Sequence, residues 1–408
     1  MNREKWCEAC EHLHILICIP HANTLGIIRS LGEAGVKPVV IVVGSFPIRS
    51  RAFIKSRYVG ELIYASDVPK AFALALKNWG GLESKPYLHV MFDYGVEVCD
   101  KMYDSLSSSF YMFGGGESGK LNPYFNKEKQ CKLAEECGLR VPSHEIVKRG
   151  ELPKKLNYPV FLKCVDSFGA WKSDMDICRT PHELLESYGR LRSSEWVMQE
   201  YVEKQTEVSL QGISVRGGEN VYMPLKKVYT RQREKDYGTY MYYEKNDLPK
   251  ELNNGVSRMI RTMGFSGCFE VEFLLGKDGK YHFLEVNMRY SASNQGMHLG
   301  GVNLPMEWAA AELKGRIDEE DISVRKGRFY VMNELFDIEF QLKPGHITLW
   351  QWLKDFLRAD GYYLWKWSDP LPALWMMFCV HGSKIRNCLT AVKKTASQIV
   401  QHFFRQHW

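Results

Sequence analysis

The densest group of polar residues that could carry out chemistry lies between positions 270 and 289. Glu270 and Glu272 alternate with apolar residues on one expected strand. Glu285, Asn287 and Arg289 alternate in the same way on the next expected strand, so each set shares one face. Pairing of the two strands would bring Glu272, Glu285 and Asn287 together. Carboxylate and amide oxygens are ligands that suit Mg²⁺, and a neighbouring arginine would hold a phosphoryl oxygen. The alternative is a solvated strand face with cross-strand ion pairs.

A second group of residues supplies the groups that a nucleotide needs. It consists of Lys127, Lys163, Glu200, Tyr201, Val202 and Glu207. Lys127 opens an expected helix, and Lys163 lies on an apolar strand where a lysine is out of place unless it meets an anion. Backbone groups at the end of the strand before Glu207 could read an adenine edge. Taken singly, each of these residues also fits a plain surface position.

The first hundred residues alternate between expected strands and helices. Buried strands are expected at His14–Ile19, Pro38–Val43 and Tyr87–Phe92, with helices at Leu25–Ala34 and Val68–Trp79. This alternation predicts a parallel sheet covered by helices on both faces. The turn after the first strand lacks G-x-G-x-x-G, so no dinucleotide site is expected there. The glycines at 114–116 are interpreted as an interdomain hinge, with a phosphate loop as the alternative.

After about residue 140 the pattern changes to runs of strands between helices, which predicts an α+β region. Strands are expected at 158–164, 196–202, 207–215, 220–229, 268–275 and 280–287, and helices at 126–138, 181–191 and 248–263. The sequence Lys277-Asp278-Gly279 is a hairpin signal between the last two strands.

The order of these features resembles the ATP-grasp superfamily, especially its carboxylate-amine ligases and carbamoyl-phosphate-synthase-like members. The similarity covers about residues 12 to 310, and its Glu-x-Asn-x-Arg element is the run that begins at Glu285. By this resemblance, the two lysines contact ATP phosphates, and the residues of the segment 200–207 contact the nucleoside. The implied roles are phosphate binding by Lys127 and Lys163, nucleotide contacts by Glu200, Tyr201, Val202 and Glu207, magnesium binding by Glu272, Glu285 and Asn287, and catalysis by Arg289 and Lys163.

The resemblance also implies a fold class of α/β and α+β. A Rossmann-like domain at residues 1–120 would precede an ATP-grasp domain at 121–335, which holds a small lid subdomain at about 140–202. A C-terminal extension with a basic amphipathic helix would occupy 336–408. The family's phosphate lid is often glycine-rich, whereas the run 166–173 contains the single glycine Gly169, whose backbone and neighbouring serines still offer donors.

The implied reaction is ADP-forming ligation, in which a carboxylate attacks the γ-phosphate of ATP and an amine then displaces phosphate from the acyl phosphate. Such chemistry needs alignment and charge neutralisation more than a protein nucleophile. The expected cofactors are ATP and Mg²⁺, with Mn²⁺ as an alternative metal. The small polar run 290–296 suggests an acceptor or carboxylate subsite and is similar to D-aspartate-ligase-like enzymes of bacterial cell-envelope and polysaccharide pathways. The alternatives are a non-catalytic ATP-binding regulatory or scaffold protein and a phosphotransferase or carboxylase-like enzyme.

The net charge and the cysteine content indicate which partners and which cellular location to expect for this protein. The net charge of +6 over 408 residues gives weak grounds for a nucleic-acid partner, so small-molecule carboxylate and amine substrates are expected. Eleven scattered cysteines, with neither a signal peptide nor a long apolar span in evidence, predict a cytoplasmic protein. Cys7 and Cys10 with His12 and His14 invite a zinc hypothesis, but the C-x-x-C has no second pair and a frayed N-terminus is favoured.

The region after residue 340 is rich in tryptophan, and from Ser383 onward it holds five basic residues and no acidic one. Apolar residues there recur at spacings of three and four, which predicts an amphipathic helix. Such a helix can lie on the inner face of an anionic membrane, and docking on its own protein is the favoured alternative. A homodimer is a further expectation.

Overall fold

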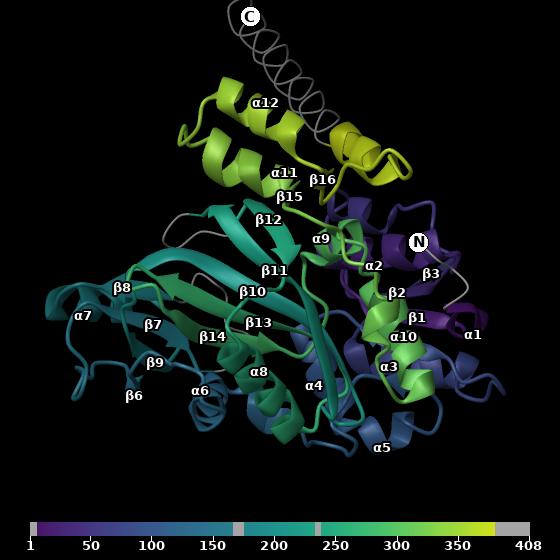
Figure 1. Cartoon of the computed structure of the whole chain (residues 1–408), viewed down its shortest axis with the longest axis horizontal. Coiled ribbons are helices and arrows are strands. Elements are labelled where there is room, and N and C mark those ends of the chain that lie inside the picture. Colours follow the sequence, from purple (N-terminus) through teal and green to yellow (C-terminus); the bar gives the residue numbers. More distant parts are fainter. Residues whose placement is uncertain (1–5, 166–174, 233–237, 380–408) are drawn as a thin grey trace, which may run out of the picture.

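The computed structural model describes residues 6–165, 175–232 and 238–379. Three β-sheets organise these residues, and Figure 1 shows the C-terminal helices stacked above them. The predicted lid run at 166–173 and the predicted basic helix from Ser383 to Trp408 lie outside the described residues.

The first sheet is five-stranded and parallel, with the strand order β3-β2-β1-β4-β5. Its strands are β1 (His14–Cys18), β2 (Val39–Val43), β3 (Glu61–Ala65), β4 (Tyr87–Val90) and β5 (Tyr111–Met112). The accompanying helices are α1 (Cys7–Glu11), α2 (Ala22–Ala34), η2 (Ser50–Ile54), α3 (Val68–Trp79), α4 (Asp93–Lys101) and α5 (Tyr103–Leu106). Every residue of β1 and β2 is buried, because their apolar runs are covered on both faces. Gly35 ends α2 with φ 99°, a conformation that favours glycine.

The central sheet has seven strands in the order β14-β13-β10-β11-β12-β15-β16. Its strands are β10 (Lys204–Val215), β11 (Asn220–Arg231), β12 (Tyr240–Lys245), β13 (Gly267–Gly276), β14 (Tyr281–Asn287), β15 (Phe329–Met332) and β16 (Gly361–Tyr362). Neighbouring strands are antiparallel except for the parallel pair β15 and β16. The nearby helices are α8 (Lys250–Met263), α9 (Asn294–Leu299), α10 (Leu304–Lys314) and η4 (Glu319–Asp321).

One continuous apolar core joins the first and central sheets. Trp308 of α10 packs edge-on against Tyr87, His89 and Phe113, and so connects the two sheets. Gly114, in the predicted hinge, forms an isolated antiparallel bridge with Ser266. The two larger units are therefore packed together around this junction.

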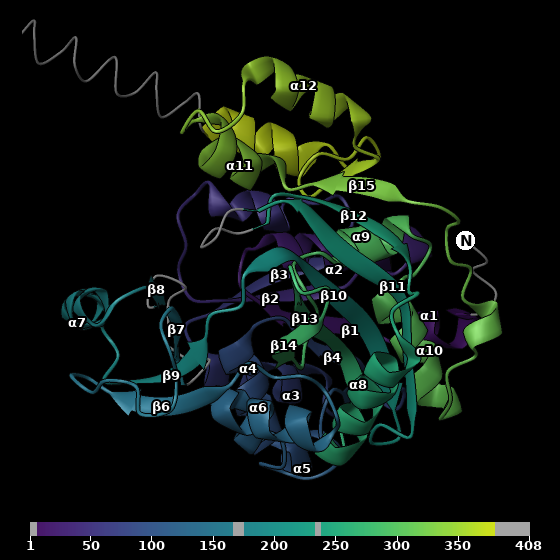
Figure 2. The ribbon, with the colours of Figure 1, turned by 60° about the vertical axis from the view of Figure 1, so that its left-hand side comes forward.

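The small sheet, with the strand order β6-β9-β7-β8, has a separate core that includes Trp196 and Leu162. Its elements are β6 (His144–Lys148), β7 (Val160–Cys164), β8 (Asp176–Cys178), α7 (Pro181–Arg190) and β9 (Glu195–Glu200), and they follow η3 (Asn122–Phe125) and α6 (Lys127–Glu136). Figure 2 shows this unit projecting to one side of the molecule, next to the edge of the central sheet that carries β14.

The residues after 333 return to the first sheet's helices. They form α11 (Glu334–Asp337), η5 (Ile338–Leu342), α12 (Leu349–Arg358), β16 and a further helix at residues 371–379. Arg29 of α2 forms a fully buried ion pair with Asp369 at 3.0 Å. The carboxylate of Glu334 accepts three backbone N–H bonds, from residues 363, 364 and 365. These contacts fix the C-terminal segment beside α2.

No helix among the described residues has the length and apolarity needed to cross a bilayer.

Candidate active site

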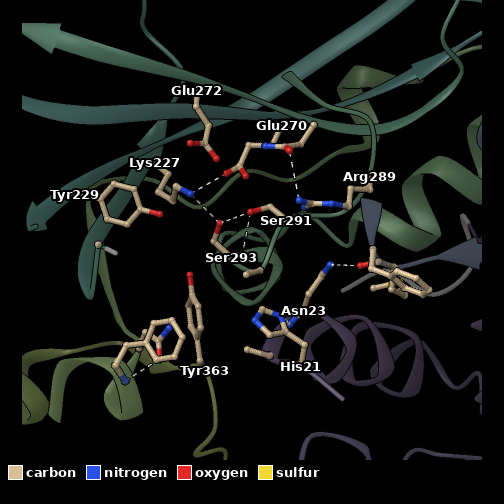
Figure 3. Close-up of a pocket in the computed structure, with 18 of the residues that line it drawn as sticks. His21, Asn23, Lys227, Tyr229, Glu270, Glu272, Arg289, Ser291, Ser293 and Tyr363 are labelled. Atoms are coloured by element: carbon tan, nitrogen blue, oxygen red, sulfur yellow. Dashed lines mark hydrogen bonds and ion pairs between the residues drawn. The ribbon is translucent and has the colours of Figure 1, made fainter. Parts of the chain in front are cut away.

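A cavity of about 380 Å³ lies where the first sheet, the central sheet and the C-terminal segment meet. Carboxylates of β10, β13 and β14 line one part of it. Residues after β1, on β11 and between β14 and α9 line the other part, together with Tyr363 (Figure 3). The lining therefore combines segments that are far apart in the sequence.

The predicted pairing of the two acidic strands is confirmed. Glu272 lies directly opposite Glu285 across β13 and β14, and Glu270 lies opposite Asn287. All four residues line the cavity. The amide of Asn287 donates to Glu285 at 3.4 Å, so these two side chains are in contact.

The donors of this strand pair fit a hard divalent cation. Glu272 and Glu285 offer carboxylate oxygens to the same cavity, and Asn287 offers an amide oxygen. Mg²⁺ is commonly held by one or two carboxylates, with water and phosphate oxygens completing its octahedron. The residues present therefore fit Mg²⁺ bound together with a phosphate ligand.

The two predicted phosphate lysines both reach the strand that carries Glu285. Lys127, the first residue of α6, lies 3.5 Å from the Glu285 carboxylate. Asn126 caps the same helix by accepting from the backbone N–H of Lys129. The buried Lys163 of β7 donates to the carbonyl oxygen of Leu284 at 3.2 Å. Burial lowers the pKa of Lys163, and the positive charge of Lys127 acts in the same direction.

The predicted nucleoside residues occupy the connection between the small and central sheets. Glu200 ends β9, and Tyr201 and Val202 lead from it toward β10. These three are not among the cavity-lining residues, whereas Glu207 of β10 is. Glu207 forms an ion pair with Lys204 at 3.0 Å. Residues 200–202 therefore lie outside the cavity that the acidic strands line, whereas Glu207 lies inside it.

Arg289 has a carboxylate partner that sequence reasoning did not identify. Its guanidinium donates to both oxygens of Asp93, the first residue of α4, at 2.5 and 2.9 Å. It also contacts the amide oxygen of Asn287 at 3.4 Å. Burial alone would lower the pKa of Arg289, but the Asp93 carboxylate outweighs it and raises that pKa. Arg289 is therefore held as a cation at the boundary between the acidic strands and the first sheet.

A buried ion pair lies deeper in the cavity wall. Lys227 of β11 contacts Glu270 at 2.7 Å, and both side chains are almost fully buried. Lys227 also donates to Ser293 at 3.0 Å (Figure 3). Ser209 donates to Glu270 at 2.9 Å. Burial opposes charge on both groups, yet their attraction raises the pKa of Lys227 and lowers that of Glu270.

The predicted acceptor run contributes small polar groups to the cavity. Ser291, Ala292 and Ser293 line it, and the Ser291 and Ser293 hydroxyls lie 2.7 Å apart. Tyr243 donates to the backbone oxygen of Ser293 at 3.0 Å, which holds this turn against the central sheet. These contacts position hydroxyl groups next to the Lys227–Glu270 ion pair.

The zinc hypothesis for the N-terminus gains no support from the described residues, among which no group of three His, Cys, Asp or Glu side chains is placed to hold a metal. Cys10 donates to the carbonyl of Ala34, and His12 contacts the carbonyl of Lys85. His14 is bonded to His89 at 3.0 Å, and burial lowers the pKa of His14 to about 4.

Comparisons with known proteins agree with this geometry. A family described as "ATP-grasp in the biosynthetic pathway with Ter operon" matches residues 192–334. The N5-carboxyaminoimidazole ribonucleotide synthase of Staphylococcus epidermidis is 27% identical over 171 residues, which are 40% of this chain and 43% of that protein. The chain thus spans less than half the length of that curated relative.

Solved structures show the same fold at low identity. The biotin carboxylase domain of Hydrogenobacter thermophilus 2-oxoglutarate carboxylase, in complex with MgADP, ADP and bicarbonate, gives a TM-score of 0.61 at 17% identity, covering 78% of this chain and 73% of that one. An L-amino acid ligase from Bacillus licheniformis gives 0.60 at 16% identity, covering 78% and 79%.

The fold, with its small sheet beside a larger mixed sheet, is shared with these solved structures. The resemblance found in the sequence is supported: residues 192–334 match an ATP-grasp family, and the two solved structures share the fold of the chain.

Proposed function

We propose that this protein is an ADP-forming ligase that joins a carboxylate to an amine through an acyl phosphate. The observation that carries the proposal is the direct pairing of Glu272 with Glu285 on one face of the cavity, within reach of Lys127 and beside Arg289. This arrangement concentrates oxygen ligands and cations where a nucleotide's phosphates would lie between the small and central sheets.

Each side chain then has a definite task. Lys127 and Lys163 neutralise the phosphate oxygens, and Glu272, Glu285 and Asn287 hold Mg²⁺, which supplies charge neutralisation at the transferring phosphoryl group. Arg289, oriented by Asp93, lies where it can hold the developing acyl-phosphate oxygens. No side chain needs to act as a nucleophile in this scheme.

The hinge residues Glu200, Tyr201 and Val202 are proposed to contact the adenine, and Glu207 the ribose. Their position between the two sheets supports this assignment, because a nucleotide bridging the sheets would pass the connection that joins them. Mn²⁺ could replace Mg²⁺ at the same oxygen ligands.

A phosphate-release screen tests the proposal. The intact protein with Mg-ATP is offered amino acids and sugar acids singly and in pairs. Phosphate release that requires both a carboxylate and an amine supports ligation. Phosphate release that needs bicarbonate in place of the organic carboxylate, with an acceptor for its carboxyl group, would favour a carboxylase-like enzyme. ATP binding without turnover on any pair would favour the non-catalytic alternative.

Glu285→Gln tests whether phosphate release in this screen comes from the assigned site, because it removes the charge of a proposed metal ligand with little change in volume. Glu219→Gln, on the exposed turn between β10 and β11, is the comparison variant. Turnover that survives in Glu285→Gln would contradict the assigned site. A role in cell-envelope or polysaccharide modification and a cytoplasmic location stay predictions, and envelope-derived amines in the same screen test the former.

A further inference from the structure

Exposed apolar side chains are concentrated at one end of the molecule. Of the fifteen large hydrophobic residues exposed in the described parts of the chain, nine lie between 349 and 378. We call these nine the aromatic face: Leu349, Trp350, Leu353, Leu357, Trp367, Leu371, Leu374, Met377 and Phe378. Both ribbon views place α12 and the helix at 371–379 at the same end of the molecule (Figures 1 and 2).

The helix at 371–379 is apolar on two sides but packs through only one of them. Ala373 and Met376 are buried in a small core with Leu25 of α2 and Ala52 of η2. On its outer side, Leu374 is 50% exposed and Phe378 is 73% exposed. Apolar side chains that are exposed together on one side of a helix are typical of an interaction site.

Helix α12 repeats the pattern. None of its ten residues is buried, although its apolar residues fall on one stripe. Trp350 and Leu357 are 80% and 81% exposed. Phe356 stacks on Tyr362 with 4.5 Å between the ring centres, but packing within the described residues leaves Trp350 and Leu357 exposed.

A basic edge adjoins the aromatic face. Arg49, Arg51, Lys55 and Arg57 are exposed on the segment that contains η2. This segment touches the helix at 371–379, because the Trp375 indole donates to the Ile48 carbonyl at 3.1 Å.

The basic side chains of this edge have contacts other than ion pairs with carboxylates in the described part of the chain. Lys55 lies 4.8 Å from the centre of the Trp375 ring, and Arg57 contacts the Ser368 carbonyl. Within the described residues, none of the four basic side chains forms an ion pair with a carboxylate. The nearby carboxylate of Asp369 is instead fully buried against Arg29. The edge therefore presents net positive charge to the surroundings.

We propose that the aromatic face and its basic edge bind the surface of an anionic lipid bilayer. Tryptophan, phenylalanine and leucine side chains enter the interfacial region, while neighbouring cations meet lipid phosphates. The chain beyond residue 379 carries five further cations and no acidic residue, so its charge adds to this attraction. The proposal is independent of the ligase activity.

Flotation of the full-length protein with vesicles tests the proposal. Vesicles of phosphatidylcholine alone are compared with vesicles that also contain phosphatidylglycerol, at low and at high salt. We expect flotation only with the anionic vesicles, and weaker flotation at high salt because exposed charges are screened. Equal binding to both kinds of vesicle, or none to either, would overturn the proposal.

Substitutions in the full chain locate the contact. Arg49→Ser with Arg51→Ser should lower partitioning onto anionic vesicles by roughly thirtyfold at low salt. The matched control, Lys154→Ser with Lys155→Ser, removes two exposed cations near the small sheet and should leave partitioning unchanged. Equal effects of the two pairs would show that only total charge matters and would refute a specific face.

Leu374→Gln with Phe378→Gln tests the apolar contribution and should lower partitioning by more than about tenfold. Its control is Leu152→Gln with Leu185→Gln, whose side chains are 48% and 53% exposed elsewhere. Two other occupants predict different outcomes. If the aromatic face joins two copies of the chain, Leu374→Gln with Phe378→Gln would dissociate a dimer without changing flotation. If other residues of the chain cover the aromatic face, the same double variant would have a lower thermal stability and unchanged flotation. Either of these two results would overturn the proposal.

Discussion

The contact between Arg289 and Asp93 allows a quantitative test of the proposed chemistry. Asp93→Asn keeps the shape of the side chain but removes the charge that holds the guanidinium through contacts of 2.5 and 2.9 Å. Arg289 stays charged in the variant, since guanidinium groups do not lose their proton in proteins. The variant therefore tests the orientation of Arg289 and leaves its charge unchanged.

The expected effect follows from the exposure of the contact. A buried charge-assisted hydrogen bond is worth about 1.5–3 kcal/mol. The Asp93 side chain is 38% exposed, so solvent screening reduces the contribution of the pair. We take about 1.5 kcal/mol, which corresponds to roughly a tenfold loss in kcat.

Steady-state kinetics with a substrate pair from the screen provide the measurement. We expect kcat to fall roughly tenfold and the KM for ATP to change little, because Arg289 is assigned to the acyl phosphate rather than to the nucleotide. Asp318→Asn, which removes a surface carboxylate paired with Lys314 at 2.7 Å, is the control. A kcat for Asp93→Asn equal to that of the control would refute the orienting role.

Three further predictions concern individual residues. Glu285→Gln should abolish turnover while the melting temperature stays near that of the parent, as thermal unfolding would show. Lys163→Met should weaken ATP binding by calorimetry without loss of stability, because burial of its ammonium is unfavourable in the nucleotide-free protein. In the parent protein, ATP affinity should fall as the pH rises through the lowered pKa of Lys163, since the bound phosphates favour its charged form. Asp369→Asn should cost about 3–5 kcal/mol in urea unfolding, because it leaves Arg29 charged and buried.

Each of these predictions has an outcome that contradicts it. Activity of Glu285→Gln at saturating magnesium would remove that residue from the metal site. A pH dependence of ATP affinity that persists in Lys163→Met would assign the titration to another group. Unfolding of Asp369→Asn within about 1 kcal/mol of the parent would show that water relieves the Arg29 charge.

The part of the site that was predictable is the part built from neighbouring strands. The turn at residues 277–279 joins β13 to β14, so the pairing of these two strands was predictable. The register shift between Glu272 and Phe273, which places Glu272 opposite Glu285, was not. Lys163 was identifiable because a lysine stands out in an apolar strand, and it is buried as expected.

Contacts between residues far apart in the chain could not be predicted from the sequence pattern. Asp93 is one of many acidic residues at helix starts, and nothing local shows that it meets Arg289 almost two hundred residues later. The Lys227–Glu270 pair joins β11 and β13, which are separated by β10, and only the strand order of the sheet brings the two side chains together. Strand β3 was missed because only Ala65 of its five residues is buried, which leaves a weak apolar pattern.

The buried ion pair between Arg29 and Asp369 also constrains the order of events during synthesis. Arg29 is synthesised 340 residues before Asp369. Until Asp369 is available, the Arg29 guanidinium lacks the carboxylate that it contacts in the folded protein. Loop closure over such a sequence distance is slow relative to local pairing. A nascent chain can therefore assemble its parallel sheet early, but it cannot form this buried ion pair until after residue 369 has been added.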